Sequence, residues 1–149
     1  MADKNPKIGI LMGSDSDLEV MRETEKRLDS FGIAYETRIL SAHRPPEKAA
    51  EYAATAQQRG LEAIICGAGA AAHLAGAIAA NTTLPVIGIP IDSSSPNGLD
   101  ALLATVQMPA GIPVATMAIG KAGAANAGIF AGQIVGRKDG AVAGRVEQF

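Results

Sequence analysis

The sequence predicts an α/β fold in which a parallel sheet of five strands is covered by helices on both faces. Three observations carry this prediction. Apolar runs of strand length alternate five times with helical patterns, the strand segments are apolar on both faces, and 149 residues suit a single core. Strands of this kind belong to parallel sheets buried between two layers of helices. We therefore expect one domain over residues 1–149, a three-layer α/β/α sandwich with the doubly wound strand order 2-1-3-4-5.

The first two strands are expected at residues 7–12 and 33–40, which are largely apolar runs bounded by glycine or polar residues. Between them, four apolar side chains spaced along one helical face predict a helix: Leu18, Met21, Leu28 and Phe31. Ser16 and Glu19 have the spacing of a capping box at the start of this helix, and Gly32 suits its end.

The rest of the chain repeats this alternation. Strands are expected at three further apolar runs, residues 62–66, 84–89 and 112–117. Helices are expected over four segments, residues 45–60, 71–80, 99–106 and 121–135. Proline near the start of the first of these helices and Gly60 at its end favour its bounds. Residues 137–149 are a polar C-terminal tail for which the pattern predicts no element.

The composition excludes several classes of protein. With 48% hydrophobic residues the chain is too apolar to be disordered, and a net charge of -2 with 3% aromatic residues argues against nucleic-acid binding. The one cysteine, Cys66, cannot form an internal disulfide or a cysteine-rich zinc site, and no other cluster predicts a metal. No segment has the pattern of a signal peptide or a membrane span, so we expect a cytoplasmic protein without membrane partners.

Charged residues are distributed unevenly along the chain. Only four lie between residues 61 and 136: Glu62, Asp92, Asp100 and Lys121. A surface with so little charge is hard to keep monomeric in water. Either this half of the chain is a core of small residues or, as we prefer, it faces other subunits of a homo-oligomer.

In such a sheet ligands bind at the carboxyl ends of the strands, so the residues after each strand are the candidates for a site. Polar or glycine-rich segments follow all five predicted strands: 13–17, 41–44, 67–73, 92–95 and 120–121. The two histidines of the chain, His43 and His73, are both among them. Because strands 2 and 3 flank strand 1 at a spacing of about 4.8 Å, one small ligand can touch Ser14, His43 and His73 together.

The segment Gly13-Ser14-Asp15-Ser16-Asp17 opens a helix, where free N–H groups and the helix dipole favour an anion. It can equally serve as an N-cap alone. Two aspartates repel a bare phosphate, which favours a sugar phosphate whose ribose hydroxyls bind a carboxylate. After the second strand, Arg44 suits a phosphate or carboxylate, and His43 is the best candidate for a general acid/base. The alternatives are a solvated loop for this pair and a structural role for His73.

Two other patterns indicate different functions. Gly67-Ala68-Gly69-Ala70-Ala71-Ala72 follows a strand and matches the G-x-G-x-x-A pattern of a dinucleotide site, with Asp92 located 20 residues beyond it. This pattern predicts an NAD-dependent oxidoreductase, although a chain rich in glycine and alanine produces such matches by chance. Asp15, Asp17 and Lys121 stand where a phospho-receiver module has its acidic and lysine residues. The third strand, however, is not followed by the aspartate that such a module phosphorylates.

Five blocks of the chain resemble the bacterial N5-carboxyaminoimidazole ribonucleotide mutase family of purine biosynthesis. In order, they are Gly13-Ser14-Asp15-Ser16-Asp17, Ser41-Ala42-His43-Arg44, Gly67-Ala68-Gly69-Ala70-Ala71-Ala72-His73-Leu74, residues 98–103 with 106–111, and residues 118–127. The resemblance covers nearly the whole chain. It implies a flavodoxin-like three-layer fold and a homo-octamer. It also implies a reaction without a redox step, and hence no cofactor and no metal.

The resemblance further implies which reaction occurs and which residues carry it. A carboxylate moves from the exocyclic nitrogen of the nucleotide N5-CAIR to ring carbon C4, giving CAIR for IMP synthesis, and travels as CO2 trapped beside the ring. His43 matches the family's catalytic histidine, and three residues match its substrate-binding positions: Ser14, Asp17 and Arg44. The other residues expected at the substrate come from the same blocks: Ser16, Ser41, Ala42, Gly67, Ala68, Gly69, His73 and Leu74.

The chain departs from the family's pattern at three positions. The glycine-rich block of the family usually has glycine where this chain has Ala70 and proline where it has Ala75, and threonine is common at the position of Pro45. The related animal-type carboxylases carry Ser-Asn-Gly in place of the Ala-Ala-His-Leu block. The presence of His73 therefore favours the mutase.

Overall fold

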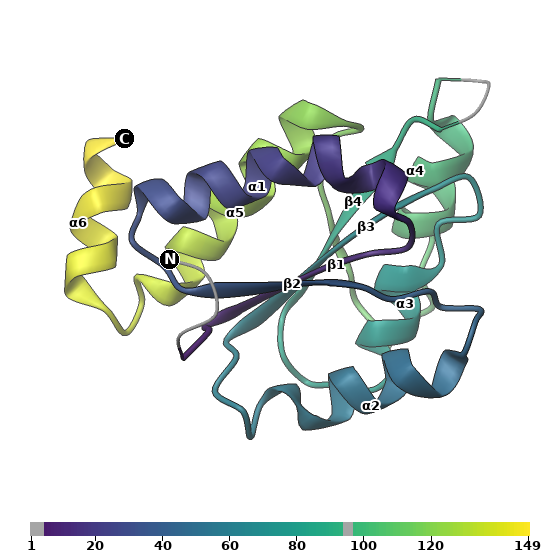
Figure 1. Ribbon diagram of the computed structural model, residues 1–149, viewed down its shortest axis with the longest axis horizontal. Coiled ribbons are helices and arrows are strands. Elements are labelled where there is room, and N and C mark those ends of the chain that lie inside the picture. Colours follow the sequence, from purple (N-terminus) through teal and green to yellow (C-terminus); the bar gives the residue numbers. More distant parts are fainter. Residues whose placement is uncertain (1–4, 94–96) are drawn as a thin grey trace.

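The computed structural model describes residues 5–93 and 97–149 and confirms the predicted parallel α/β sheet (Figure 1). Its strand order is β2-β1-β3-β4-β5, and every neighbouring pair is parallel, as the sequence predicts. The five strands are β1 (Ile8–Met12), β2 (Tyr35–Ile39), β3 (Ala63–Gly69), β4 (Val86–Ile91) and β5 (Ala115–Thr116). The edge strand β5 is much shorter than the run 112–117 from which it was predicted.

Helices cover both faces of the sheet. They are the 3-10 turn η1 (Asp15–Asp17), α1 (Leu18–Ser30), α2 (Pro46–Ala56), α3 (Leu74–Ala79), α4 (Leu99–Val106), α5 (Lys121–Val135) and α6 (Gly140–Gln148). Figure 1 shows α1 and α5 side by side on one face, with α2 and α3 on the other. None of the helices in the described ranges is long and apolar enough to cross a membrane.

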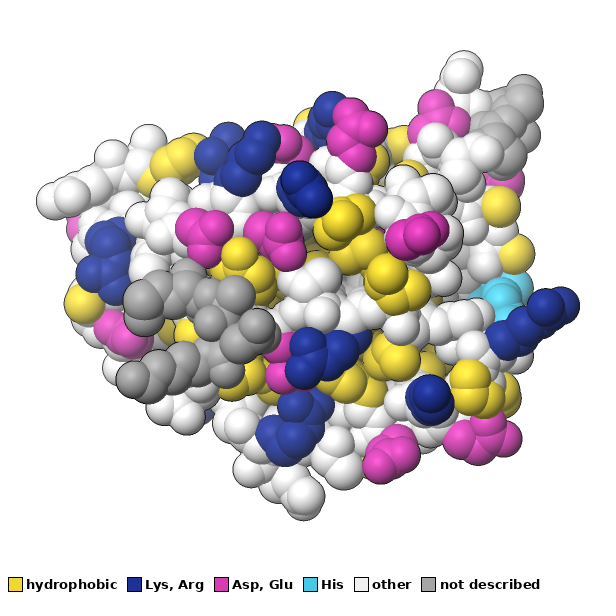
Figure 2. All heavy atoms as spheres, in the orientation of Figure 1, with side chains coloured by type: hydrophobic (Ala, Val, Ile, Leu, Met, Phe, Trp, Pro, Cys, Tyr) yellow, Lys and Arg dark blue, Asp and Glu magenta, His cyan; other side chains and the backbone are white. Residues whose placement is uncertain are grey.

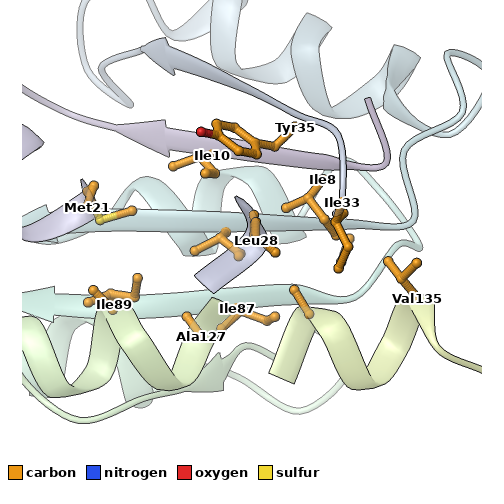
Figure 3. Close-up of a cluster of buried hydrophobic side chains, with 14 of the residues drawn as sticks. Ile8, Ile10, Met21, Leu28, Ile33, Tyr35, Ile87, Ile89, Ala127 and Val135 are labelled. Carbon is orange, nitrogen blue, oxygen red and sulfur yellow. The ribbon is translucent and has the colours of Figure 1, made fainter. Parts of the chain in front are cut away.

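Each face of the sheet has its own core. On the α1 and α5 side, isoleucines of β1 and β4 pack against buried side chains that include Leu28 and Ala127 (Figure 3). On the other side, Leu11, Ile64 and Cys66 pack against the alanines of α2 and against α3. The central strands β1, β3 and β4 are therefore buried on both faces, which is why their sequences are apolar. The edge strand β2 is buried only at its start and contains Glu36, Thr37 and Arg38.

The helices α1 and α5 approach closely because α5 is made of small residues. A Cβ on Gly128 would lie 2.7 Å from the Arg27 Cβ, so the close approach leaves no space for a side chain there. In the same contact the buried Thr24 hydroxyl donates a hydrogen bond to the Ala124 carbonyl at 2.7 Å. The abundance of glycine and alanine in this half of the chain thus serves packing within the domain as well as any packing between subunits.

The predicted capping box does not form, and the serine two residues earlier takes its place. Ser14 is the N-cap of η1, and its hydroxyl accepts a hydrogen bond from the Ser16 N–H at 3.3 Å. The Ser16 side chain is 3.0 Å from that of Ser14 instead of reaching into α1. The cause is the extra 3-10 turn, which separates β1 from α1 and was not predicted; at the start of α1 itself, Asp17 makes no side-chain cap.

The polar tail forms a helix that packs on the domain. Asp139 caps α6 by accepting from the N–H groups of Ala141 and Val142. Arg145 then donates from Nε to the Phe31 carbonyl oxygen at 2.6 Å, at the C-terminal end of α1. Val142 is the one buried residue of α6, so the segment has too few apolar positions to show a helical period in its sequence.

A buried carboxylate fastens α2 to the edge strand β2. Glu36 is 5% exposed, and it accepts hydrogen bonds from Tyr52 Oη at 2.6 Å and Arg59 Nη1 at 3.0 Å. Burial raises the pKa of Glu36, but these two hydrogen bonds, with the charges of Arg59 and Arg38, outweigh it and lower that pKa overall. This contact holds the helix that follows the second polar loop.

Candidate active site

A pocket with a volume of about 220 Å³ lies at the carboxyl edge of the sheet, where the loops after β1, β2, β3 and β4 converge. Its lining is composed of small, hydroxyl and histidine side chains: Gly13, Ser14, Ser16, Asp17, Ser41, Ala42, His43, Ala68, Gly69, Ala71, His73, Leu74 and Ser93. Figure 2 shows histidine at the margin of the molecule toward which the strands run in Figure 1, while charged side chains gather over α1 and α2. The predicted topology therefore brings four loops to one hollow.

All the predicted site residues line this pocket except Arg44 and Gly67. Arg44 has an exposed side chain, and its backbone N–H donates to the pocket residue Ser41 at 3.2 Å. Gly67 is buried within β3, where a Cβ would overlap the sulfur of Met21, so its lack of a side chain serves the core under the pocket.

The β1 loop presents two hydroxyls and one buried carboxylate. Ser14 and Ser16 are exposed and hydrogen-bonded to each other, whereas Asp17 is 6% exposed. Burial raises the pKa of Asp17, and a hydrogen bond from the Ser14 backbone offsets part of this effect. A partly desolvated carboxylate gains most from new hydrogen-bond donors, which suits the hydroxyls of a sugar.

The β2 loop is shaped by the Ser41 side chain. Its Oγ accepts from the backbone N–H groups of His43 at 3.1 Å and Arg44 at 3.2 Å, closing a tight turn directly after the strand. Pro45 and the N1 residue Pro46 follow, so the loop passes at once into α2. The result is an exposed imidazole at the pocket, carried on a short loop whose backbone is hydrogen-bonded.

The two histidines meet in the pocket although they are 30 residues apart in the sequence. His43 Nε2 lies 3.1 Å from His73 Nδ1, and the rings are edge to face with centroids 5.3 Å apart. A hydrogen bond between two imidazole nitrogens requires one donor and one acceptor. When His43 is an imidazolium, its Nε2–H therefore donates to His73, whose ring must then be neutral with its own proton on Nε2.

The glycine-rich block does not form a dinucleotide site. β3 runs to Gly69, three residues beyond its predicted end, so both glycines of the G-x-G-x-x-A pattern lie in the strand. Helix α3 begins only at Leu74 and spans six residues. The pattern requires the glycine turn to open a helix whose N-terminus meets the pyrophosphate, and this segment does not do so. Ala70 instead turns the chain with a φ of +52°.

The receiver alternative has no support either. Lys121 donates from Nζ to Glu19 Oε1 at 3.2 Å, and it does not line the pocket. Within the described residues, no three metal-ligating side chains gather in one place.

Sequence reasoning missed three lining residues, Gly13, Ala71 and Ser93. The sequence signal for Ser93 is its place directly after the fourth strand, in the polar segment 92–95. Ser94 and Ser95 of the same segment lie outside the described residues.

Comparison with known proteins agrees with the resemblance. The family model described as AIR carboxylase matches residues 7–149. A relative from Vibrio parahaemolyticus is 54% identical over 143 residues (96% of this chain, 89% of the relative), and one from Pyrococcus horikoshii is 58% identical over 138 residues (93% and 77%). Both are named N5-carboxyaminoimidazole ribonucleotide mutase. The crystal structure of Treponema denticola PurE matches with a TM-score of 0.85 at 30% identity, covering 96% of this chain and 88% of that one. The chain therefore belongs to the AIR carboxylase family.

Proposed function

We propose that this protein is an N5-carboxyaminoimidazole ribonucleotide mutase, an isomerase that converts N5-CAIR to CAIR in IMP synthesis. The observation that carries the proposal is the meeting of His43 and His73 in one pocket with the Ser14 and Asp17 loop. An acid/base group thus stands beside groups that suit a sugar phosphate. The relatives that carry this name are similar to the chain over nearly all its length.

The reaction balances with a single acid/base group, which we assign to His43. In the first step the bond between the exocyclic nitrogen and the carboxyl carbon breaks. The electron pair stays on nitrogen, which takes a proton from the His43 imidazolium, and CO2 is released. In the second step C4 uses a ring electron pair to bond to CO2, and neutral His43 removes the proton that C4 loses. One proton leaves the imidazole and one returns, so the catalyst is restored.

His73 assists by accepting a hydrogen bond from the charged form of His43. Its Nδ1 lies 3.1 Å from His43 Nε2, and that contact fixes the orientation of the catalytic ring. With Ala68, Gly69 and Leu74, His73 also forms the part of the wall that we propose encloses CO2. A pocket of about 220 Å³ has room for a small ring and its carboxylate, and walls this close to the reacting group would limit the escape of CO2 between the two steps.

The rest of the nucleotide would lie along the loops. We assign the phosphate to Ser14 and Arg44, because hydroxyl and guanidinium groups donate to anions. Asp17 and Ser16 would bind the ribose, and the hydroxyl hydrogen bonds would offset the desolvation of the buried carboxylate. Ser41 and Ala42 form the turn against which the ring would rest.

We further propose that the protein is a cytoplasmic homo-octamer. The resemblance implies the number of subunits, and association itself is supported by the near absence of charge between residues 61 and 136 and by an apolar stripe on α4. On this helix Leu99, Leu103 and Val106 are 48%, 49% and 42% exposed and share one face. Light scattering should then give a mass eight times the 15.2 kDa of one chain, and a monomer would contradict the assignment.

The function is tested by mixing purified protein with N5-CAIR, without ATP or added bicarbonate, and following CAIR by absorbance or chromatography. We expect CAIR to form far above the uncatalysed rate. Isothermal calorimetry with NAD serves as the control for the dinucleotide alternative, and we expect no binding. An absence of CAIR above the uncatalysed rate would refute the proposal.

A further inference from the structure

We propose that the Ser93 hydroxyl contacts the substrate, donating a hydrogen bond to the migrating carboxyl group while that group is free as CO2. This inference rests on the mutase activity proposed above. It adds a group from a fourth strand to a site that the sequence placed on the loops after the first three.

The first observation is the position of Ser93 over β3. Parallel pairing places Gly69 of β3 beside Ile91, the last residue of β4, and Ser93 follows two residues later in the loop that leaves this strand. A Cβ on Gly69 would overlap the Ser93 hydroxyl, lie 2.8 Å from its Cβ and lie 3.0 Å from the Ile91 carbonyl oxygen. The missing side chain of Gly69 therefore makes room for the Ser93 hydroxyl at the pocket wall.

The second observation is that this hydroxyl has no hydrogen-bond partner among residues 5–93 and 97–149. The other three serines of the pocket are engaged: Ser14 and Ser16 with each other at 3.0 Å, and Ser41 with two backbone N–H groups. Among the residues that the structure describes, none forms a hydrogen bond with the Ser93 side chain, which is exposed and lines the pocket. Of the four pocket serines, Ser93 is thus the one whose side chain forms no hydrogen bond within the described residues, so it can both donate to a ligand and accept from one.

The chemistry of the wall selects the migrating carboxyl group as the acceptor. Gly69 begins the segment that leads to His73, and this segment is part of the wall that we propose surrounds CO2. CO2 is a weak acceptor, but its oxygens are negatively charged both before the N–C bond breaks and after the C–C bond forms. A fixed donor therefore positions the carboxyl group before the N–C bond breaks and again as the C–C bond forms. It also holds the molecule near C4 between the two steps.

The test is to measure both products with Ser93→Ala. CAIR reports transfer, and free aminoimidazole ribonucleotide reports escape of CO2, in which case the proton given by His43 is replaced from water. We expect CAIR formation to fall about ten- to a hundredfold, as for loss of a hydrogen bond to a charged group. The ratio of aminoimidazole ribonucleotide to CAIR should rise. Because Ser93 is exposed, the unfolding temperature should not change.

Two variants complete the design. Ser93→Thr retains the hydroxyl and should restore most of the CAIR rate and the product ratio. Ser30→Ala removes a hydroxyl that bonds the Arg27 carbonyl outside the pocket, and it should match the wild type. The inference is overturned if Ser93→Ala keeps the wild-type rate and ratio, or if both products fall in proportion. If the wild type makes no CAIR, the proposed function itself fails, which is a distinct result.

Discussion

Replacing Ala70 with glycine should stabilise the protein, because this residue holds a backbone conformation that side chains disfavour. The φ of Ala70 is +52°, in the left-handed region. There a Cβ costs roughly 1–2 kcal/mol, which glycine avoids. Glycine in turn loses about 0.4–1 kcal/mol through the greater freedom of the unfolded chain. The difference between these two ranges predicts a net gain in unfolding free energy of up to about 1.5 kcal/mol. Each kcal/mol gained should raise the unfolding temperature by roughly 2–4 °C.

The assay is thermal unfolding at one protein concentration, with Ala71→Gly as the matched control. Ala71 is the adjacent exposed residue and is not among the described residues with positive φ. Glycine at position 71 should lower the unfolding free energy by about 0.5–1 kcal/mol, because it gives the unfolded chain more conformational freedom and relieves no strain in the folded state. Opposite signs at neighbouring alanines would support the reasoning. A loss of stability in Ala70→Gly as large as in the control would refute it.

Three further changes test the site and its support. His43→Asn should lower kcat by about a thousandfold in the CAIR assay while leaving the oligomer mass unchanged, and near-wild-type turnover would remove His43 from its role. Asp17→Asn should raise KM about tenfold, as a lost hydrogen bond to a charged group requires. An unchanged KM would contradict this assignment. The same change should stabilise the fold at neutral pH, because burial raises the pKa of Asp17 and its buried charge destabilises the folded state there. That cost disappears only as pH falls through the raised pKa. Glu36→Gln should lower the unfolding free energy by about 1–2 kcal/mol at pH 7. The difference from wild type should shrink in acid, as pH falls below 4.5 and through the lowered pKa of Glu36. A difference that does not depend on pH would count against the network with Tyr52 and Arg59.

The architecture could be predicted because strand sequences report burial directly. Strands buried on both faces are apolar at every position, and their alternation with helices leaves few topologies. Helix bounds at Leu99–Val106 and Lys121–Val135 agree with the structure because glycine marks the start of each one. The capping box failed because Ser14 and Ser16 are both good caps, and only the tertiary path from β1 into η1 decides between them. Helix α6 is stabilised by contacts such as that of Arg145 with Phe31, which no local pattern contains.

The site was predictable to the level of its loops. The rule that parallel strands present their carboxyl ends to one edge placed both histidines there. It could not give the 3.1 Å contact between them, which depends on Ala70 turning the chain after an extended β3. Ser93 was missed because a hydroxyl after a strand is common in loops, and its role depends on the space left by Gly69.

The central claim is that the carboxyl group moves within one enclosed pocket, and an isotope experiment tests it directly. N5-CAIR labelled with 13C at its carboxyl carbon is converted in buffer that contains excess unlabelled bicarbonate, and the CAIR formed is analysed by mass spectrometry. Transfer within this pocket of about 220 Å³, without exchange with the solution, predicts that CAIR retains most of the label. CAIR whose carboxyl carbon has the isotopic composition of the bicarbonate pool would contradict the account.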